Sequence, residues 1–282
     1  MKRYRILKFH IDSTRNIVRS ENPADNLRME EIKKEMKDSL VLKYGQHNFD
    51  IKFKRYMELE APSFSVVEEH TFLIEDICDA YVQGSFYSAL TGACCLGERI
   101  FNNIIFKVFN DFKSSEQYKE IFNKNRRGGS IIDWDKGISI LKNWNIINDE
   151  VELKFKRLSQ LRTESVHYQN REQDLGRMSL EAINVINFIV NKLFGLNQTR
   201  RDILLWFDVP GELYIRNDAE KNPLIKAFYL PCSFYVGPRH DIKNDSNLSK
   251  LTISDNHSYG DAIITDDEFI RLRKEYTNKD IK

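Results

Sequence analysis

Two long apolar stripes with helical spacing dominate the middle of this chain. They cover residues 67–81 and 86–112, and within each stripe apolar residues recur at every third or fourth position. This spacing places them on one face of an α-helix, and such a face must be buried against other elements. Pro62 precedes the first stripe, and Gly195 follows the last helical pattern. The sequence therefore predicts an antiparallel helical bundle over residues 61–196.

Four to five helices are expected within this bundle, joined by short loops. The second helix is the most apolar, so we expect it at the centre. Gly97 lies inside this helix, where glycine costs about 1 kcal/mol relative to alanine, and another helix is therefore expected to approach closely there. Residues 113–132 are polar and broken, and they are expected to form a loop. The adjacent Arg126 and Arg127 fit either a plain surface loop or a contact with phosphate.

The regions that flank the bundle have a different character. Residues 1–60 are expected to form a small α/β region with a first strand near residues 4–11 and a charged helix over residues 25–40. A half-buried strand is predicted at residues 49–53, because Phe49, Ile51 and Phe53 alternate with polar residues.

Residues 197–282 are expected to form a β-rich appendage that ends in a charged helix from Asp266 to Tyr276. Its short β-like runs are punctuated by proline and glycine, and they fall at residues 203–207, 213–215, 227–230, 233–236 and 263–264. The predicted fold class is therefore α+β, with a central antiparallel helical bundle, a small N-terminal α/β region and a β-rich C-terminal appendage.

The overall charge excludes a strongly basic or acidic protein. Lysine and arginine number 43 and aspartate and glutamate 42, which gives a net charge of +1. Bulk charge therefore predicts no polyanion partner, although it leaves room for a local basic cleft. The basic N-terminus is not followed by the apolar run of a signal peptide, and no apolar run approaches the roughly 18 residues of a membrane span. We therefore expect a cytoplasmic protein with no membrane partner.

Cysteine and histidine spacing argues against a metal centre. The four cysteines form no CxxC pair and are expected to be buried free thiols in a reducing cytosol: Cys78, Cys94, Cys95 and Cys232. His70 lies on an apolar stripe and is expected at the core or its boundary. His240 and His257 lie in polar loops and are expected at the surface. No metal and no cofactor are predicted.

The stretch LSQLRTESVHYQ, residues 158–169, contains an arginine and a histidine five positions apart, Arg162 and His167. Arg5 and His10 have the same spacing, but they fall in the predicted first strand. An odd spacing there would place the two side chains on opposite faces, so this second pair is rejected as a site.

Arg162 and Ser165 continue the apolar row of Val151, Phe155 and Leu158 on the predicted helix. A charged residue in an apolar seam is costly unless it is paired or lines a cleft. Arg162 and His167 lie about 140° apart around the helix, since each residue turns it by about 100°, and they therefore flank a groove.

Glu98 and Arg99 interrupt the apolar surface of the second long helix. Two interpretations stay open for them. They form a solvated pair at the edge of the bundle, or they contribute polar groups to a cleft.

The bundle resembles the HEPN superfamily (higher eukaryotes and prokaryotes nucleotide-binding domains). Two stretches carry the resemblance: LRTESVHYQ, with Arg162 and His167, and the long helix YSALTGACCLGERIFNNIIFKVF before it. The resemblance covers about half of the chain. It implies a metal-independent endoribonuclease, of the kind found in bacterial toxin–antitoxin and antiviral defence systems.

The residues fit the chemistry that the resemblance implies. RNA cleavage by attack of its own 2′-OH needs a proton-transfer group that titrates near neutral pH and a fixed cation on the phosphate. His167 can serve as the general acid or base. Arg162 can hold the phosphate. Thr163, Tyr168 and Glu98 are the candidate substrate-binding residues.

The implied partners are RNA, a second copy of the chain, and an antitoxin or regulatory protein; DNA is not expected. In the family two bundles pack about a two-fold axis, so that two Arg–His pairs line one cleft. A symmetric dimer of this kind is also the commonest oligomer of proteins in general.

The sequence departs from the family at two positions. Thr163 stands where many members have Asn, Asp or His after the arginine. Gln169 stands where members paired with a minimal nucleotidyltransferase antitoxin have a tyrosine, so regulation by adenylylation there is not expected. Two alternatives to the ribonuclease remain. One is a catalytically inactive HEPN module that binds RNA, a nucleotide or a protein partner, and the other is an unrelated helical interaction protein.

Overall fold

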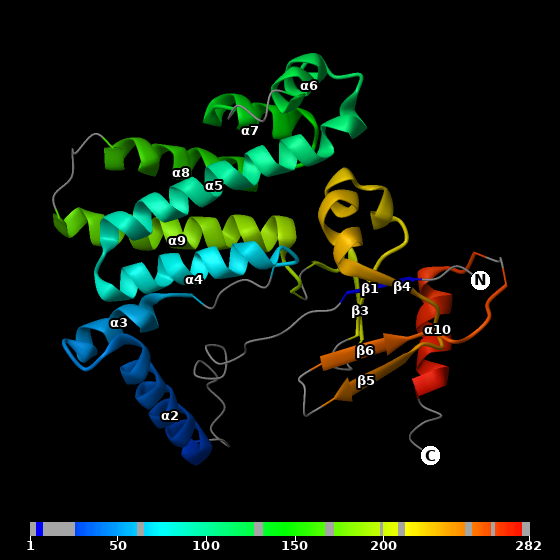
Figure 1. The fold of residues 1–282 in the computed structure, drawn as a ribbon, viewed down its shortest axis with the longest axis horizontal. Helices are drawn as coiled ribbons and strands as arrows, with labels where there is room; N and C mark the ends of the chain where they lie inside the picture. The colour runs from blue at the N-terminus through cyan, green and yellow to red at the C-terminus, as the bar shows by residue number, and fades with distance from the viewer. Residues whose placement is uncertain are drawn as a thin grey trace. The chain divides into compact units, whose positions relative to one another are not determined.

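The structure is a computed structural model. It describes residues 4–7, 26–60, 65–126, 132–166, 172–197, 200–207, 212–245, 250–260 and 263–277. The described residues belong to two compact units. The helical unit contains the described residues from Asn26 to Gly195, and the sheet unit contains residues 4–7 and the described residues from Leu196 onwards. The protein is mostly helical with small antiparallel sheets, as expected for the α+β class (Figure 1).

The helical unit is built around one long helix, α5. Its elements are α2 (Asn26–Tyr44), α3 (Phe49–Glu58), α4 (Glu68–Gln83), α5 (Phe86–Val108), η2 (Phe109–Phe112), α6 (Tyr118–Arg126), α7 (Trp134–Asn143), α8 (Asp149–Val166) and α9 (Glu172–Phe194). Helix α5 packs against α4, α7, α8 and α9, and α4, α5, α8 and α9 lie side by side (Figure 1). The two long helices predicted from the apolar stripes are therefore confirmed, and so is the central position of the second.

Gly97 is a point of close approach between α5 and α8. A Cβ atom at this position would collide with the Leu158 side chain, and it would lie 3.1 Å from the ring of Trp134. Leu158 is completely buried, so it has little room to move away. The close approach that the sequence predicted at Gly97 is confirmed.

The strand predicted at residues 49–53 is wrong, because these residues begin helix α3. Phe49 and Phe53 are four positions apart, and their rings lie 5.9 Å apart on one helix face. Tyr56 continues this face and is buried. Apolar residues at 49, 51 and 53 match a strand period, but those at 49, 53 and 56 match a helix period equally well. Packing of α3 against α4 decides between the two.

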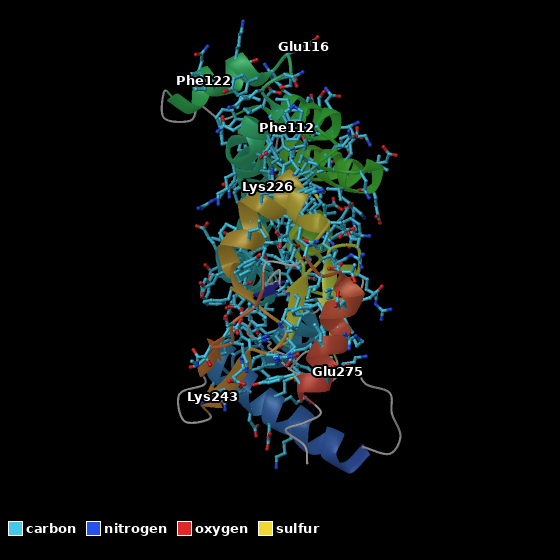
Figure 2. The ribbon with its side chains drawn as sticks, turned by 90° about the vertical axis from the view of Figure 1, so that its right-hand side faces the viewer. Phe112, Glu116, Phe122, Lys226, Lys243 and Glu275 are labelled. Atoms are coloured by element: carbon cyan, nitrogen blue, oxygen red, sulfur yellow. The ribbon has the colours of Figure 1, made fainter. Side chains whose placement is uncertain are left out.

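The broken loop predicted over residues 113–132 is also wrong in part, because residues 118–126 form helix α6. Ile121 is buried, and Tyr118 stacks on Phe109 with 5.7 Å between ring centroids. Phe112 and Phe122 lie at this same end of the unit (Figure 2). A short helix with so few apolar residues carries a weak sequence pattern, and its contacts with η2 stabilise it.

The sheet unit contains a four-stranded sheet with the N-terminal strand in its interior. The strands are β1 (Tyr4–Leu7), β2 (Leu204–Trp206), β3 (Leu213–Ile215) and β4 (Ser233–Val236), in the order β2-β3-β1-β4, and every pair is antiparallel. Strand β1 pairs with β3 on one edge and with β4 on the other. Residues 1–60 are thus not one α/β region, since β1 belongs to the sheet unit and α2 and α3 belong to the helical unit.

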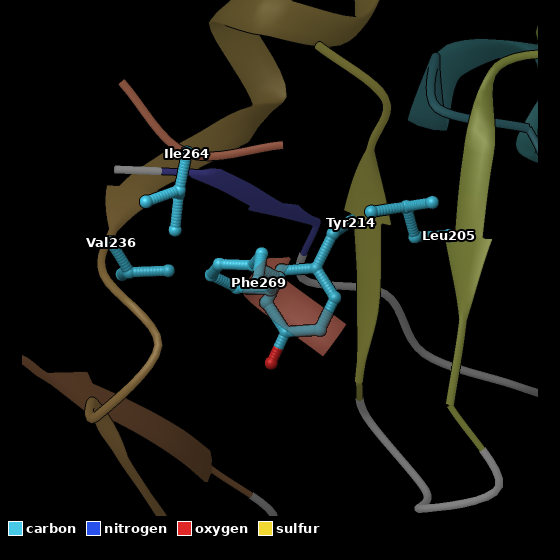
Figure 3. Close-up of a cluster of buried hydrophobic side chains, with 5 residues drawn as sticks. All are labelled: Leu205, Tyr214, Val236, Ile264 and Phe269. Atoms are coloured by element: carbon cyan, nitrogen blue, oxygen red, sulfur yellow. The ribbon is translucent and has the colours of Figure 1, made fainter. Parts of the chain in front are cut away.

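Five buried side chains form one hydrophobic cluster in the sheet unit: Leu205, Tyr214, Val236, Ile264 and Phe269 (Figure 3). The rings of Tyr214 and Phe269 lie 5.1 Å apart and join the sheet to helix α10 (Asp266–Thr277). The predicted final helix and the strands near 203–207, 213–215 and 233–236 are confirmed.

Two other predicted strands of the sheet unit are wrong. Residues 225–229 form a π-helix, labelled η5, and Ile264 fills the core from an irregular segment. A hairpin of β5 (Asp241–Asp245) and β6 (Lys250–Ser254) was not predicted, because both strands are largely polar.

The close approach at Gly97 leads to a stability prediction. Gly97→Ala should lower the free energy of unfolding by about 1–3 kcal/mol, because overpacking against Leu158 outweighs the gain in helix propensity of about 1 kcal/mol. Gly176→Ala in α9 is the matched control. Its new Cβ would lie 3.5 Å from the Phe86 ring, an ordinary contact, so this variant should be neutral or more stable. Urea unfolding followed by circular dichroism compares them, and equal stability of the two variants would contradict this packing.

Candidate functional site at the end of helix α8

Arg162 lies on α8 at the edge of a fully apolar helix face. Val151, Phe155 and Leu158 form the buried row that the sequence predicted, and each is less than 3% exposed. Leu161, which is also completely buried, continues this row, whereas the side chain of Arg162 is 47% exposed. The arginine therefore reaches solvent from a helix whose other side is held rigidly in the core.

Glu98 on α5 is the partner of Arg162. The Arg162 Nη2 atom lies 3.5 Å from the Glu98 Oε2 atom, and the Glu98 side chain is only 18% exposed. Within the described ranges, no hydrogen bond of the Arg162 guanidinium is recorded, so this ion pair leaves its planar set of donors open. Of the two interpretations that the sequence left open for Glu98, its contact with Arg162 favours the second, in which Glu98 contributes a polar group to a site.

Ser165 has a hydrogen-bond partner within its own helix. Its hydroxyl donates a hydrogen bond to the backbone oxygen of Arg162 at 2.7 Å, and the residue is buried. Arg162 itself has Glu98. Arg162 and Ser165 therefore each have a partner within one bundle, so this polar row by itself gives no argument for a second copy of the chain.

Thr163 is exposed and is already engaged with its own helix. Its hydroxyl donates to the backbone oxygen of Ser159 at 3.1 Å, which keeps the side chain close to the helix surface. The two remaining predicted site residues, His167 and Tyr168, lie outside the described residues. The structure thus brings Arg162 and Glu98 together and places Thr163 next to them in sequence, while the geometry of the Arg162–His167 pair stays a prediction.

A second arginine, Arg157, fixes α8 to α9. Its guanidinium donates two hydrogen bonds to the carboxylate of Glu181, at 2.6 and 2.9 Å, and a third, longer one to Glu164 at 3.4 Å. The guanidinium of Arg157 holds the pKa of the Glu181 carboxyl below its usual range. Sequence reasoning missed this anchor, because Arg157 and Glu181 lie 24 positions apart on different helices.

A groove of about 370 Å³ runs between α4 and α5, but it does not contain Arg162 or Glu98. Its lining is mostly apolar, and Cys95 and Arg99 line its α5 side. Arg99 is paired with Glu69 of α4 at 2.5 Å. All four cysteines are free thiols as predicted, but only Cys78 and Cys94 are buried. Cys95 and Cys232 are exposed. Cys95 follows the buried Cys94 on α5, where adjacent side chains point about 100° apart.

The prediction that His240 lies at the surface is wrong. His240 is completely buried in the sheet unit, where its Nδ1 atom lies 2.7 Å from the backbone oxygen of Gly237. The Tyr214 hydroxyl lies 3.1 Å from both the Nε2 atom of His240 and the carboxylate of Glu212. Arg273 completes the network with hydrogen bonds to Glu212 at 2.6 and 3.2 Å. Four polar residues from distant parts of the chain thus satisfy one another inside the core.

This buried network explains stability and not catalysis. His240 has no access to solvent, and burial lowers its pKa to about 4, with a smaller contribution from Arg273. His70 in the helical unit behaves alike, because burial, followed by the charges of Arg99 and Lys107, lowers its pKa to about 4. His70 is buried against the edge of Phe194, as the sequence predicted for a core histidine. Neither ring is placed to exchange protons with a substrate at neutral pH.

No group of three or more His, Cys, Asp or Glu with metal-binding geometry occurs in the part of the chain that the structure describes. None of its described helices combines the length and the apolar character needed to cross a bilayer. Comparisons with protein families, with curated proteins and with solved structures find no match to this chain.

The two buried histidines predict loss of stability in mild acid. Their pKa is about 4 in the folded state and about 6.5 in the unfolded chain, so the unfolded chain binds protons that the folded state excludes. Their contribution is complete above pH 6.5 and is lost as the pH falls towards 4. At pH 5 the loss reaches about 2 kcal/mol for each histidine.

Urea unfolding at pH 7 and pH 5 measures this loss. His70→Gln and His240→Gln should each show a smaller difference between the two pH values than the unaltered protein. His47→Gln is the control, because His47 is exposed and its variant should lose as much stability as the unaltered protein. An unchanged pH dependence in both buried-site variants would contradict the assignment.

Proposed function

We propose that the protein is a metal-independent endoribonuclease of a bacterial defence or toxin–antitoxin system, and that its helical unit is a HEPN-type bundle. The observation that carries the proposal is the half-exposed guanidinium of Arg162 at the edge of the packed helices, whose one ion pair among the described residues is with Glu98. An arginine whose planar donors are open to solvent is suited to a phosphodiester.

The proposed chemistry is transesterification within the RNA backbone. The 2′-oxygen of one ribose attacks the neighbouring phosphorus, the bond from phosphorus to the 5′-oxygen of the next nucleotide breaks, and a cyclic phosphate forms. Arg162 stabilises the negative charge that develops on the phosphate oxygens. His167, five residues later in the sequence, transfers the proton to the leaving 5′-oxygen or takes it from the attacking hydroxyl. Thr163 and Tyr168 would contact the substrate beside this pair.

We further propose that the protein acts in the cytosol as a homodimer, in which the ends of two α8 helices line one cleft. One arginine and one histidine for each chain is a sparse set for catalysis, and a second copy would double it. An antitoxin or a regulatory protein would then control the cleft by covering it. No DNA and no membrane partner is proposed.

The second candidate function is a catalytically inactive HEPN module that binds RNA, a nucleotide or a protein. The observation that favours it is the position of Thr163, whose hydroxyl is engaged by the backbone of its own helix. The Thr163 hydroxyl would then have no hydrogen to donate in a transition state, although Arg162 could still bind an anion.

Cleavage of RNA in the presence of EDTA tests the first function against the second. Arg162→Ala and His167→Ala should each slow fragment formation by about 100-fold or more, the usual contribution of a positioned catalytic group. EDTA should leave the unaltered protein active. Arg99→Ala is the matched control, since Arg99 is also an exposed arginine of the bundle in an ion pair with a glutamate. It should cleave like the unaltered protein.

Two results would contradict the catalytic roles. One is unchanged cleavage by His167→Ala, and the other is an equal loss in Arg99→Ala and Arg162→Ala. If the unaltered protein cleaves no RNA but binds it, the inactive module becomes the better assignment.

The homodimer is tested separately by light scattering after size exclusion at micromolar concentration. The expected mass is twice the 33.3 kDa of one chain. The Arg162→Ala variant should have the same mass, because removing one exposed side chain leaves the bundle in place. A monomer in both samples would contradict the proposed cleft between two copies.

A further inference from the structure

We propose that Glu98 recognises the 2′-hydroxyl of the ribose whose 3′-phosphate Arg162 binds, and that this contact makes the site selective for RNA over DNA. The inference rests on the proposed function, because it assumes that Arg162 holds a phosphodiester. In this inference, the choice of RNA as substrate depends on two side chains that the fold brings together, Glu98 from α5 and Arg162 from α8.

Glu98 lies in a closely packed part of the helical unit. It follows Gly97, which packs against Leu158 of α8, and its backbone oxygen accepts a hydrogen bond from the Asn102 side chain at 2.9 Å. Its own side chain is largely covered. A carboxylate on such an element has a well-defined position, which a group that discriminates between similar ligands requires.

The carboxylate of Glu98 can accept further hydrogen bonds. Its two oxygens offer about four positions for hydrogen-bond donors. Over the described residues, no hydrogen bond to this carboxylate is recorded, and the guanidinium of Arg162 approaches it only as an ion pair at 3.5 Å. A largely buried carboxylate is stabilised by donors, so a ligand hydroxyl that reached it would satisfy an acceptor that the protein leaves open.

The charges of the pair determine what kind of ligand fits. Arg162 attracts an anion, but Glu98 beside it repels the same anion, so an anion without other groups gains little. A ligand gains from both residues only if it presents a negative charge to Arg162 and a hydrogen-bond donor to Glu98 a few ångströms away. Like-charge repulsion of this kind is a common way of rejecting the wrong ligand.

RNA has this arrangement in every nucleotide, because the 2′-hydroxyl lies next to the 3′-phosphate of the same ribose. DNA has the phosphate and lacks the hydroxyl, so Glu98 would face a phosphate with no donor to compensate. The 2′-hydroxyl is the group by which proteins distinguish the two nucleic acids. The ion pair of Glu98 and Arg162 is therefore suited to bind RNA and to disfavour DNA.

Fluorescence anisotropy with three labelled oligonucleotides of one sequence tests the inference. They are RNA, the 2′-O-methyl RNA, which keeps the oxygen but not the donor, and DNA. All measurements use the full-length chain with His167→Ala, so that the RNA stays intact. This protein should bind RNA about tenfold more tightly than either of the other two, the usual value of one hydrogen bond to a charged group.

Two substitutions of Glu98 in this background separate its acceptor from its charge. Glu98→Ala should reduce the preference for RNA to within about twofold, with binding of DNA equal or tighter because the repulsion is gone. Glu98→Gln keeps an acceptor oxygen and should retain part of the preference. Glu69→Gln is the control, since Glu69 of α4 is also a glutamate in an ion pair, with Arg99 of α5. This variant should leave the tenfold ratio unchanged.

The outcomes distinguish this inference from the proposed function. If Glu98→Ala keeps the full preference for RNA, or weakens RNA and DNA equally, Glu98 only holds Arg162 and the inference is overturned while phosphate binding stands. Arg162→Ala should weaken all three ligands alike. If it weakens none of them, or if the chain with His167→Ala as its one substitution binds no oligonucleotide, the proposed function fails together with the inference. Circular dichroism confirms that each variant is folded.

Discussion

The burial of one broad face of α5 is the constraint on which the helical unit depends. Four of the described helices pack around it, and eleven of its 23 residues are buried. Gly97 shows how little space remains, since even one added methyl group would collide with Leu158. A helix packed in this way fixes the positions of the helices around it. Helix α8 in particular cannot shift along α5 without opening a cavity.

The candidate site follows from this packing. Glu98 and Arg162 meet because α5 and α8 touch at Gly97 and Leu158. Gly97 comes one position before Glu98, and Leu158 comes four positions before Arg162. Arg157 and Glu181 add a charged anchor between α8 and α9. The exposed guanidinium of Arg162 therefore extends from a helix whose backbone is fixed by packing, so a ligand that bound it would not have to order the helix first.

The sheet unit depends on a different interaction, the buried ion pair of Arg273 and Glu212. Both side chains are nearly inaccessible, and removing one partner would leave the other charge unpaired in the core. Tyr214 and His240 belong to the same network, and Tyr214 also packs against Phe269 in the apolar core. The polar and apolar parts of this core are thus joined through one residue, which fixes α10 on the sheet.

The sequence by itself determined the long helices and the place of Arg162 near a helix end, because both follow from residue spacing along one element. It also determined that Gly97 marks a close contact. Only the tertiary structure decided that residues 49–53 are helical and that β1 lies inside a sheet built from the other end of the chain. The same holds for the burial of His240 and for the pairing of Arg162 with Glu98, 64 positions away. Each of these depends on contacts between residues far apart in sequence, and local spacing contains no information about such contacts.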